Sequence, residues 1–219
     1  MKKIEGIIFD MDGTLFDTER VALEFWRESF KRHGYVLHKD IYTSLMGRKR
    51  AKWSELLIKE YGQALPIDKI SEEKDAAMFD FINNKGVPVK KGVYELLDFL
   101  QKSSYKVALA TSTSRIRALK LLNLAKIVDK FDIIVCGDDI VNSKPSPEIF
   151  LKAAKELETD PKNCIVIEDS PVGIEAAYKA QMMPINIPDL KEPDSDMKLL
   201  SYRIYPNLLD FKDFLENEI

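Results

Sequence analysis

Three aspartates crowd the end of the first apolar run of the sequence, in the stretch IIFDMDGTLFD. Asp10 and Asp12 are two residues apart, and Asp17 follows shortly after them. Carboxylates at short range repel one another and raise one another's pKa, so such a cluster costs stability unless a cation or a reaction compensates for it. The spacing therefore predicts a metal site or a catalytic site at this point of the chain.

Polar residues with complementary chemistry follow three later apolar runs. They are Thr111 and Ser112, then Lys144, then the pair Glu168 and Asp169. In open parallel sheets, ligands bind outside the carboxyl ends of the strands. If the apolar runs are parallel strands, these residues and the first aspartates share one site.

Together these residue types suit phosphoryl transfer assisted by a metal ion. A phosphate carries negative charge, so a carboxylate nucleophile approaches it only when a cation neutralises both groups. Mg²⁺ prefers a few hard oxygen ligands together with water and phosphate oxygens. We expect Asp10, Glu168 and Asp169 to hold Mg²⁺.

The remaining polar residues would bind the phosphate itself. Lys144 and the hydroxyl of Thr111 are suited to phosphate oxygens, and backbone N–H groups near Ser112 would assist them. Each residue also has a structural alternative. Thr111 and Ser112 could cap the following helix, Lys144 could be a solvated loop residue, and Glu168 could be an exposed acid beside a metal-binding Asp169.

The elements that must position these residues alternate between strand and helix. Five short runs rich in Ile and Val predict buried strands, at 7–10, 107–111, 133–136, 165–168 and 184–187. Helical spacing of apolar residues predicts helices at 94–101, 116–124, 149–157 and 174–180. Ser146-Pro147 and Ser170-Pro171 are typical of helix starts. This alternation predicts an α/β fold with a doubly wound parallel sheet.

About ninety residues without a convincing strand separate the first two predicted strands, which is too long for a loop. Helical patterns at 19–32, 52–61 and 71–82 occupy this stretch. Trp26 and Trp53 fit the core of such a helical insertion better than a stacking platform. His33 and His38 lie among charged residues, and we expect both at its surface.

Four stretches, DMDGTLFDT, LATST, SKPSPEIF and VIEDSPVGIEAA, resemble the four motifs of the haloacid dehalogenase superfamily. The resemblance is to its branch of sugar-phosphate phosphatases and beta-phosphoglucomutase-like enzymes, and it covers nearly the whole chain. It implies a Rossmann-like core at 1–16 and 87–219 with an inserted helical cap at 17–86. It also implies that Asp10 is the nucleophile that forms an aspartyl phosphate. Asp12 would be the general acid and base, and its backbone carbonyl would ligate Mg²⁺.

The same resemblance gives expectations for the cap. Arg50 matches the arginine that meets the distal substrate phosphate in phosphoglucomutase-like members. Ala22 stands where those mutases carry a cap histidine that helps poise the sugar hydroxyl. This departure favours hydrolysis over phosphoryl transfer to a second sugar hydroxyl.

The function that the sequence favours is therefore a Mg²⁺-dependent phosphatase acting on a small phosphorylated metabolite, chiefly a sugar phosphate. A beta-phosphoglucomutase and a phosphatase for pyrophosphate or nucleotides are the alternatives among enzymes. The alternative from another class is a signalling module phosphorylated on Asp10. Against it, receiver domains place the phosphorylated aspartate after a later strand and carry no long helical insertion.

Composition narrows the class of partner. The 219 residues carry a net charge of -3, with 45% hydrophobic and 32% charged residues, which gives no reason to expect nucleic acid or an anionic membrane. No run approaches the roughly 20 apolar residues of a membrane span. We expect a cytoplasmic monomer.

The sequence also indicates roles for two cysteines and one further aspartate. Cys136 and Cys164 lie inside apolar runs without a CxxC or histidine pattern, which predicts buried reduced thiols. Asp138, in the sequence GDD, is either part of a second acidic pair with Asp139 or an organiser of the loop that leads to Lys144.

Overall fold

The chain forms two compact units, one of which is inserted into the other along the sequence. The structure, a computed structural model, describes residues 3–45 and 50–218. The larger unit comprises Met1–Asp17 and Pro88–Ile219, and the smaller unit comprises Thr18–Val87. The chain segments next to the insertion are adjacent, because Asp17 N donates a hydrogen bond to Pro88 O at 2.9 Å.

The larger unit is built on a six-stranded sheet in the order β3-β2-β1-β4-β5-β6, and each of its five strand pairs is parallel. The strands are β1 Gly6–Phe9, β2 Lys106–Ala110, β3 Ile133–Val135, β4 Cys164–Glu168, β5 Met183–Asn186 and β6 Arg203–Ile204. This order is that of a doubly wound sheet, whose direction of winding reverses between β1 and β4. The predicted α/β fold class is confirmed.

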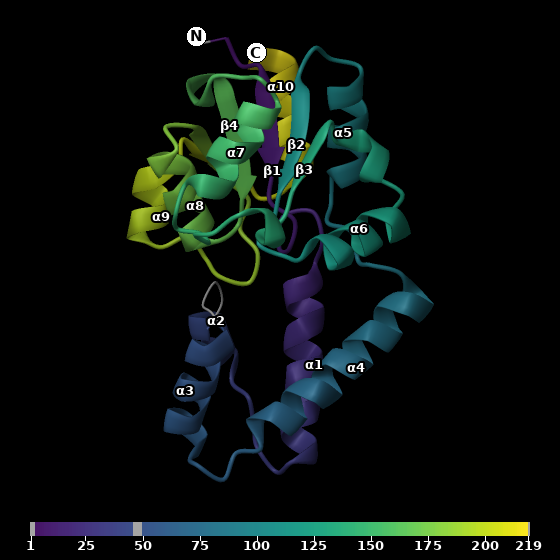
Figure 1. The fold of residues 1–219 in the computed structure, drawn as a ribbon, viewed down its shortest axis with the longest axis vertical. Coiled ribbons are helices and arrows are strands. Elements are labelled where there is room, and N and C mark those ends of the chain that lie inside the picture. The colour runs from purple at the N-terminus through teal and green to yellow at the C-terminus, as the bar shows by residue number, and fades with distance from the viewer. Residues whose placement is uncertain (1–2, 46–49, 219) are drawn as a thin grey trace. The chain divides into compact units, whose positions relative to one another are not determined.

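Helices cover both faces of this sheet, and in Figure 1 α7 and α8 lie in front of it while α10 lies behind it. The helices of the larger unit are α5 Val93–Gln101, α6 Arg115–Leu124, α7 Glu148–Glu156, α8 Pro171–Lys179, α9 Ser195–Leu200 and α10 Leu208–Glu218. Three short 3-10 helices are η1 Val128–Lys130, η2 Gly137–Asp139 and η3 Pro161–Asn163.

Alternation along the central strand β1 divides the core between the two faces. Ile8 packs in a fully buried cluster with Phe150 of α7 and Ala177 of α8. Ile7 and Phe9 are also fully buried and point to the opposite face, since successive strand side chains alternate. A strand buried on both faces needs a continuous apolar run, which is why IIF is followed by an acid only where the strand ends.

In the smaller unit, residues 18–45 and 50–87 form four helices, α1 Thr18–Arg32, α2 Lys39–Leu45, α3 Arg50–Tyr61 and α4 Ile67–Lys85. Its interior is rich in aromatic rings. The Trp26 ring lies 5.8 Å from that of Trp53 and 6.1 Å from that of Phe30, centroid to centroid. Trp26 is 5% exposed, so its predicted place in the core is confirmed.

The prediction of two surface histidines is correct for only one of them. His38 is exposed. The side chain of His33 is 16% exposed, and its Nε2 lies 3.1 Å from Glu73 Oε1 on α4. The helix pair α1 and α4 covers the imidazole, which a pattern of charged neighbours in the sequence does not reveal.

Apart from the 3-10 helices, four elements of the described residues were absent from the sequence prediction, namely α2, α9, α10 and β6. Three of them are short, whereas α10 has 11 residues and carries the buried Leu208, Phe211 and Leu215 at helical spacing, a pattern that the prediction overlooked. Both residues of β6 are exposed, so that strand lacks the apolar run that identified the others. The N-cap residue of α7 is Pro147 and not Ser146. The N-cap residue of α8 is Ser170, as expected, and its side chain accepts a hydrogen bond from Gly173 N.

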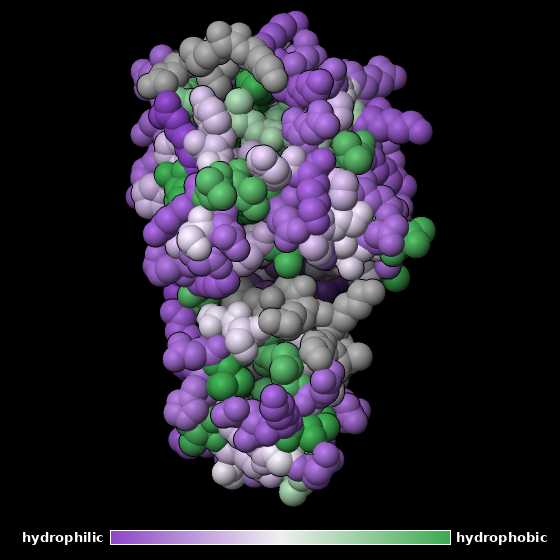
Figure 2. All heavy atoms as spheres, turned by 90° about the vertical axis from the view of Figure 1, so that its left-hand side faces the viewer, coloured by the Kyte–Doolittle hydropathy of each residue, from purple (hydrophilic) through white to green (hydrophobic). Residues whose placement is uncertain are grey.

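Figure 2 shows one face of the molecule, where hydrophilic residues cover most of the larger unit and hydrophobic residues occur in small separate groups. Such scattered groups are normal for a protein surface. None of the helices in residues 3–45 and 50–218 has both the length and the apolar content that a bilayer crossing requires. Both cysteines, Cys136 and Cys164, are buried free thiols, as expected.

Candidate active site

Asp10 directly follows β1 at the carboxyl edge of the sheet. Its backbone N–H donates to Ile167 O at 2.9 Å, so the pairing of β1 with β4 extends to this residue. The pairing places Asp10 beside Glu168, the last residue of β4. Asp10 is 7% exposed and Glu168 is 1% exposed, so the two acids lie together in a largely dry environment.

Lys144 lies between these two carboxylates. Its Nζ is 2.5 Å from Asp10 Oδ1 and 2.8 Å from Glu168 Oε1, and it also donates to Ala110 O at 3.3 Å. Lys144 is buried, which excludes the alternative of a solvated loop lysine. Three parallel strands, β1, β2 and β4, thus present oxygen atoms to one ammonium group.

Burial and mutual charge set the protonation of this cluster. Burial raises the pKa of Asp10 to about 7, opposed by the charge of Lys144 and assisted by that of Glu168. Burial lowers the pKa of Lys144, but the charges and hydrogen bonds of Asp10 and Glu168 raise it above its ordinary value. Lys144 therefore stays charged at neutral pH.

The second carboxylate oxygen of Glu168 is held by the start of α8. Ser170 N and Ser170 Oγ donate to Glu168 Oε2 at 2.6 and 2.9 Å. Gly173, in the same helical turn, leaves room for this carboxylate, since a Cβ there would lie 1.7 Å from Glu168 Oε1. Both oxygens of Glu168 thus have partners in Lys144 and Ser170, and its alternative as an exposed acid is wrong.

Asp12 and Asp169 complete the acidic set, each with a threonine partner. Thr113 Oγ1 donates to Asp12 Oδ2 at 2.6 Å, and Thr14 Oγ1 donates to Asp169 Oδ1 at 3.2 Å. Asp169 is 5% exposed, whereas Asp12 is half-buried. Thr113 was missed from sequence, because its partner lies 101 positions away in the chain.

The loop after β2 holds the two hydroxyl residues that were predicted to meet the phosphate. Thr111 is buried, and its Oγ1 accepts a hydrogen bond from Thr113 N at 3.1 Å. Ser112 is exposed. Neither caps the following helix, because the cap residue of α6 is Ser114. The hydrogen bond between Thr113 N and Thr111 Oγ1 therefore stabilises the loop itself and not the start of α6.

The donor set fits Mg²⁺ in its chemistry. Lys144 pairs with Asp10 and Glu168, while Asp12 and Asp169 follow the same two strands, β1 and β4, so the four carboxylates outnumber the lysine. Within residues 3–45 and 50–218, no group of three or more His, Cys, Asp or Glu side chains forms a metal cage. Mg²⁺ binds through one or two carboxylates plus water and substrate phosphates, so it needs no such cage.

Ala22 and Arg50 are the residues of the smaller unit that were predicted to influence the reaction. Ala22 lies in α1 and is half-buried. Arg50 is the first residue of α3, and its side chain lies outside the described part of the chain. The adjoining residues 46–49 of the predicted cap loop lie outside the described residues too.

Asp138 and Asp139 are structural residues. Asp138 Oδ2 accepts from Arg115 N at the start of α6, at 2.7 Å. Asp139 Oδ2 accepts from Cys136 N at 2.7 Å and pairs with the Arg115 guanidinium at 2.5 Å. These contacts tie η2 to α6, so the pair organises the loops around the site rather than forming a second acidic centre.

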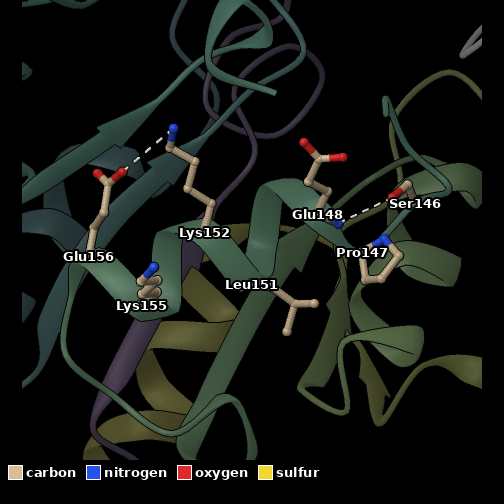
Figure 3. Close-up of a pocket in the computed structure, with 7 residues that line it drawn as sticks. All are labelled: Ser146, Pro147, Glu148, Leu151, Lys152, Lys155 and Glu156. Carbon is tan, nitrogen blue, oxygen red and sulfur yellow. Dashed lines mark hydrogen bonds and ion pairs between the residues drawn. The ribbon is translucent and has the colours of Figure 1, made fainter. Parts of the chain in front are cut away.

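A surface pocket of about 590 Å³ lies along α7. Figure 3 shows its lining residues, which all come from the start and the exposed face of this helix. They are Ser146, Pro147, Glu148, Leu151, Lys152, Lys155 and Glu156. Two lysines and two glutamates line it, and none of the predicted site residues does. The pocket is therefore separate from the acidic cluster at the sheet edge.

The family model described as haloacid dehalogenase-like hydrolase matches residues 7–187 of the chain. The matched range begins in β1 and ends just beyond β5, so it includes every predicted site residue. A phosphorylated carbohydrates phosphatase of Thermotoga maritima is 34% identical over 185 residues, which cover 81% of this chain and 82% of that protein.

Solved structures with the same fold cover almost the whole chain. A proposed beta-phosphoglucomutase from Thermotoga maritima gives a TM-score of 0.81 at 26% identity, covering 99% of this chain and 100% of that one. The beta-phosphoglucomutase from Clostridium difficile gives a TM-score of 0.74 at 26% identity, covering 97% and 96%.

Proposed function

The chain belongs to the haloacid dehalogenase-like hydrolase family, and we propose that it is a Mg²⁺-dependent phosphatase for a small phosphorylated carbohydrate. It is a hydrolase of phosphate monoesters. The proposed reaction proceeds through an aspartyl phosphate on Asp10. The carbohydrate class is taken from the name of the Thermotoga maritima phosphatase, with which the chain shares 34% identity.

The observation that carries this proposal is the placement of Lys144 between Asp10 and Glu168. A nucleophilic carboxylate must stay ionised and fixed while an anionic phosphate approaches. The ammonium group 2.5 Å from Asp10 Oδ1 stabilises the ionised carboxylate and offers positive charge to phosphate oxygens. Glu168 is held by Ser170 and fixes Lys144 in turn.

In the first step, a carboxylate oxygen of Asp10 attacks the phosphorus atom. The bond from phosphorus to the ester oxygen breaks, and its electron pair goes to the leaving alkoxide. Asp12, protonated at this stage, gives its proton to that oxygen as general acid. The products are the free alcohol and the aspartyl phosphate.

In the second step, Asp12 acts as the general base. It takes a proton from a water molecule, whose oxygen attacks the phosphorus of the aspartyl phosphate. The bond between phosphorus and the Asp10 oxygen breaks, which releases inorganic phosphate and restores the Asp10 carboxylate. Asp12 is then protonated again for the next substrate.

Asp10, Asp169 and the backbone carbonyl of Asp12 would hold Mg²⁺. When bound, the ion supplies positive charge that offsets the repulsion between the phosphate and the carboxylates. Glu168 serves mainly to position Lys144, because both of its oxygens already have partners in the protein. Thr111 and the backbone of the loop after β2 would bind phosphate oxygens.

The helical unit Thr18–Val87 would act as a cap that selects the substrate, with Arg50 directed to a second phosphate group. Ala22 has no group that can exchange a proton with a sugar hydroxyl. Water is therefore the expected acceptor of the phosphoryl group.

A panel of phosphate esters tests the proposal. Phosphate release is measured from sugar phosphates, nucleotides and pyrophosphate, with Mg²⁺ and with excess EDTA, using Asp10→Asn as the blank. We expect Mg²⁺-dependent release from a few sugar phosphates and a rate at least about 10³-fold lower in the variant, as for loss of a nucleophile. Wild-type rates in Asp10→Asn would contradict the mechanism. A phosphoryl group that persists on Asp10, without turnover of any ester, would favour a signalling module.

A mutase is the second candidate, since the Clostridium difficile structure at 26% identity is a beta-phosphoglucomutase. The test is conversion of beta-glucose 1-phosphate to glucose 6-phosphate. Conversion well above the rate of phosphate release would establish the mutase and overturn the prediction from Ala22.

A further inference from the structure

We propose that Thr113 is a positioning residue for proton transfer by Asp12, which extends the function proposed above and rests on it. The carrying contact is the hydrogen bond from Thr113 Oγ1 to Asp12 Oδ2, at 2.6 Å. It joins the loop after β2 to the loop after β1. Hydrogen bonds to an ionised carboxylate are short and strong, so this contact fixes the carboxylate plane.

The backbone of Thr113 is itself held on both sides. Its N–H donates to Thr111 Oγ1 at 3.1 Å, and its carbonyl accepts from Gly137 N at 3.0 Å. A β-branched side chain has a restricted χ1 angle, so a fixed backbone also fixes the Oγ1 atom. The hydroxyl is therefore a rigid donor.

Gly137 permits this arrangement because it lies against the backbone of the same loop. A Cβ at Gly137 would lie 2.3 Å from Ser112 O, so any larger residue would push the loops after β2 and β3 apart. Thr113 is thus wedged between β3 and the Asp12 loop. The acid and its hydroxyl partner are placed by three neighbouring strands.

The consequence concerns the two oxygens of the Asp12 carboxylate. Thr113 holds Oδ2, which restricts rotation of the carboxylate, so the same oxygen faces the leaving group in each turnover. A carboxylate free to rotate would spend part of its time with the wrong oxygen toward the leaving group. Thr113 should therefore increase the rate for substrates whose leaving group must be protonated.

A comparison of two substrates tests this role. An alkyl phosphate such as glycerol 3-phosphate releases a strongly basic alkoxide that needs the proton, whereas p-nitrophenyl phosphate releases a weakly basic phenolate that does not. The ratio kcat/KM covers the steps up to departure of the leaving group, so it reports the first proton transfer. Thr113→Val removes the hydroxyl and keeps the shape of the side chain.

We expect Thr113→Val to lower kcat/KM on the alkyl phosphate by about 10- to 100-fold, which is part of the total effect of general acid catalysis. On the aryl phosphate we expect kcat/KM to fall by less than about 3-fold. Thr113→Ser, which keeps a hydroxyl, should restore most of the loss. The matched control is Ser114→Ala, since Ser114 is an exposed neighbour whose side chain makes no cap hydrogen bond.

Equal losses on both substrates in Thr113→Val would overturn the proposal, as would failure of Thr113→Ser to restore the alkyl ester rate. Partial unfolding does not mimic the expected result, because it lowers both rates by the same factor. A wild-type enzyme with no activity on any ester would overturn the proposed function and this role together. An active wild type with an unchanged substrate ratio in the variant would overturn only the role of Thr113.

Discussion

The two units of the chain bury different kinds of side chain. At the sheet edge of the larger unit, Asp10, Lys144 and Glu168 are each no more than 8% exposed, although all three are ionisable. In the smaller unit the described interior combines aliphatic side chains with packed aromatic rings, such as those of Phe30 and Tyr61, whose centroids are 5.3 Å apart. Buried ion clusters contribute little net stability, whereas packed aromatic rings contribute a great deal. The comparison indicates that one unit is arranged for chemistry and the other for rigid packing.

The largest effect should follow removal of Lys144. Lys144→Met leaves Asp10 and Glu168 as buried carboxylates without a cation, so we expect the free energy of unfolding to fall by about 3–5 kcal/mol. Loss of a charge that stabilises the transition state should also lower kcat/KM by at least about 10²-fold. Urea unfolding followed by circular dichroism, together with phosphate release, measures both changes.

A triple variant separates charge from packing at this site. Asp10→Asn, Lys144→Met and Glu168→Gln together remove all three charges, so the triple variant should regain much of the stability while remaining inactive. Full stability in the single variant Lys144→Met would show that the cluster is solvated, and it would remove the contrast between the two units.

The next effect tests the aromatic core of the smaller unit. Phe30 is fully buried, so Phe30→Ala should lower the stability of this unit by about 3–5 kcal/mol through the cavity it leaves. The two tryptophans of the chain, Trp26 and Trp53, both lie in this unit, so tryptophan fluorescence reports its unfolding selectively. Val36→Ala, at a position 66% exposed, is the control and should stay within about 0.5 kcal/mol.

Tryptophan fluorescence also tests whether the two units unfold independently of each other. Lys144→Met should leave the tryptophan transition in place while it shifts the transition seen by circular dichroism. A common shift of both signals in either variant would show that the two units unfold as one, and would argue against separate roles in stability.

A smaller effect is expected from the support of Glu168. In Gly173→Ala the new Cβ would meet the Glu168 carboxylate at 1.7 Å, so Glu168 must move and Lys144 with it. We expect overpacking to cost about 1–3 kcal/mol. The displaced site should lose about 10- to 100-fold in kcat/KM. Glu175→Ala, at an exposed ion pair on the same helix, should change neither quantity by much, and similar activity in the two variants would contradict the supporting role of Gly173.

Buried apolar runs in the sequence predicted most of the sheet. Five of the six strands were predicted because each is a buried apolar run, and the run of Ile7 to Phe9 is completely buried. The strand β6 was missed because both of its residues are exposed and only pairing with β5 defines it. Sequence periodicity detects burial, and it fails for elements that tertiary pairing alone creates.

The candidate site shows the same division. The clustering of Asp10, Lys144 and Glu168 followed from the rule that parallel strands end at one edge. The partner of Asp12 did not follow, because Thr113 lies next to Ser112 in a stretch of four consecutive hydroxyl residues, 111–114. The backbone contacts of that loop with Gly137 and Thr111 hold Thr113 in the conformation that turns it toward the acid.

The smallest effect concerns the ion pair of Asp139 with Arg115, outside the reactive cluster. Burial raises the pKa of Asp139, but the Cys136 N–H and the Arg115 guanidinium lower it more, so its folded-state pKa lies below the ordinary value. A carboxyl whose pKa is lowered by folding stabilises the protein above the pKa of the unfolded chain, about 4, and this stabilisation is lost as the pH falls through the folded-state pKa.

Asp139→Asn should therefore cost about 1–2 kcal/mol at neutral pH, the contribution of a hydrogen bond to a charged group. The difference between the variant and the wild type should shrink as the pH is lowered below about 4. Urea unfolding at a series of pH values measures it, and Asp129→Asn, on the short helix η1, is the control. A difference that does not vary with pH would mean that Asp139 acts through packing alone. The charged loops around the site would then resemble the aromatic core of the smaller unit more closely than the buried cluster of Lys144.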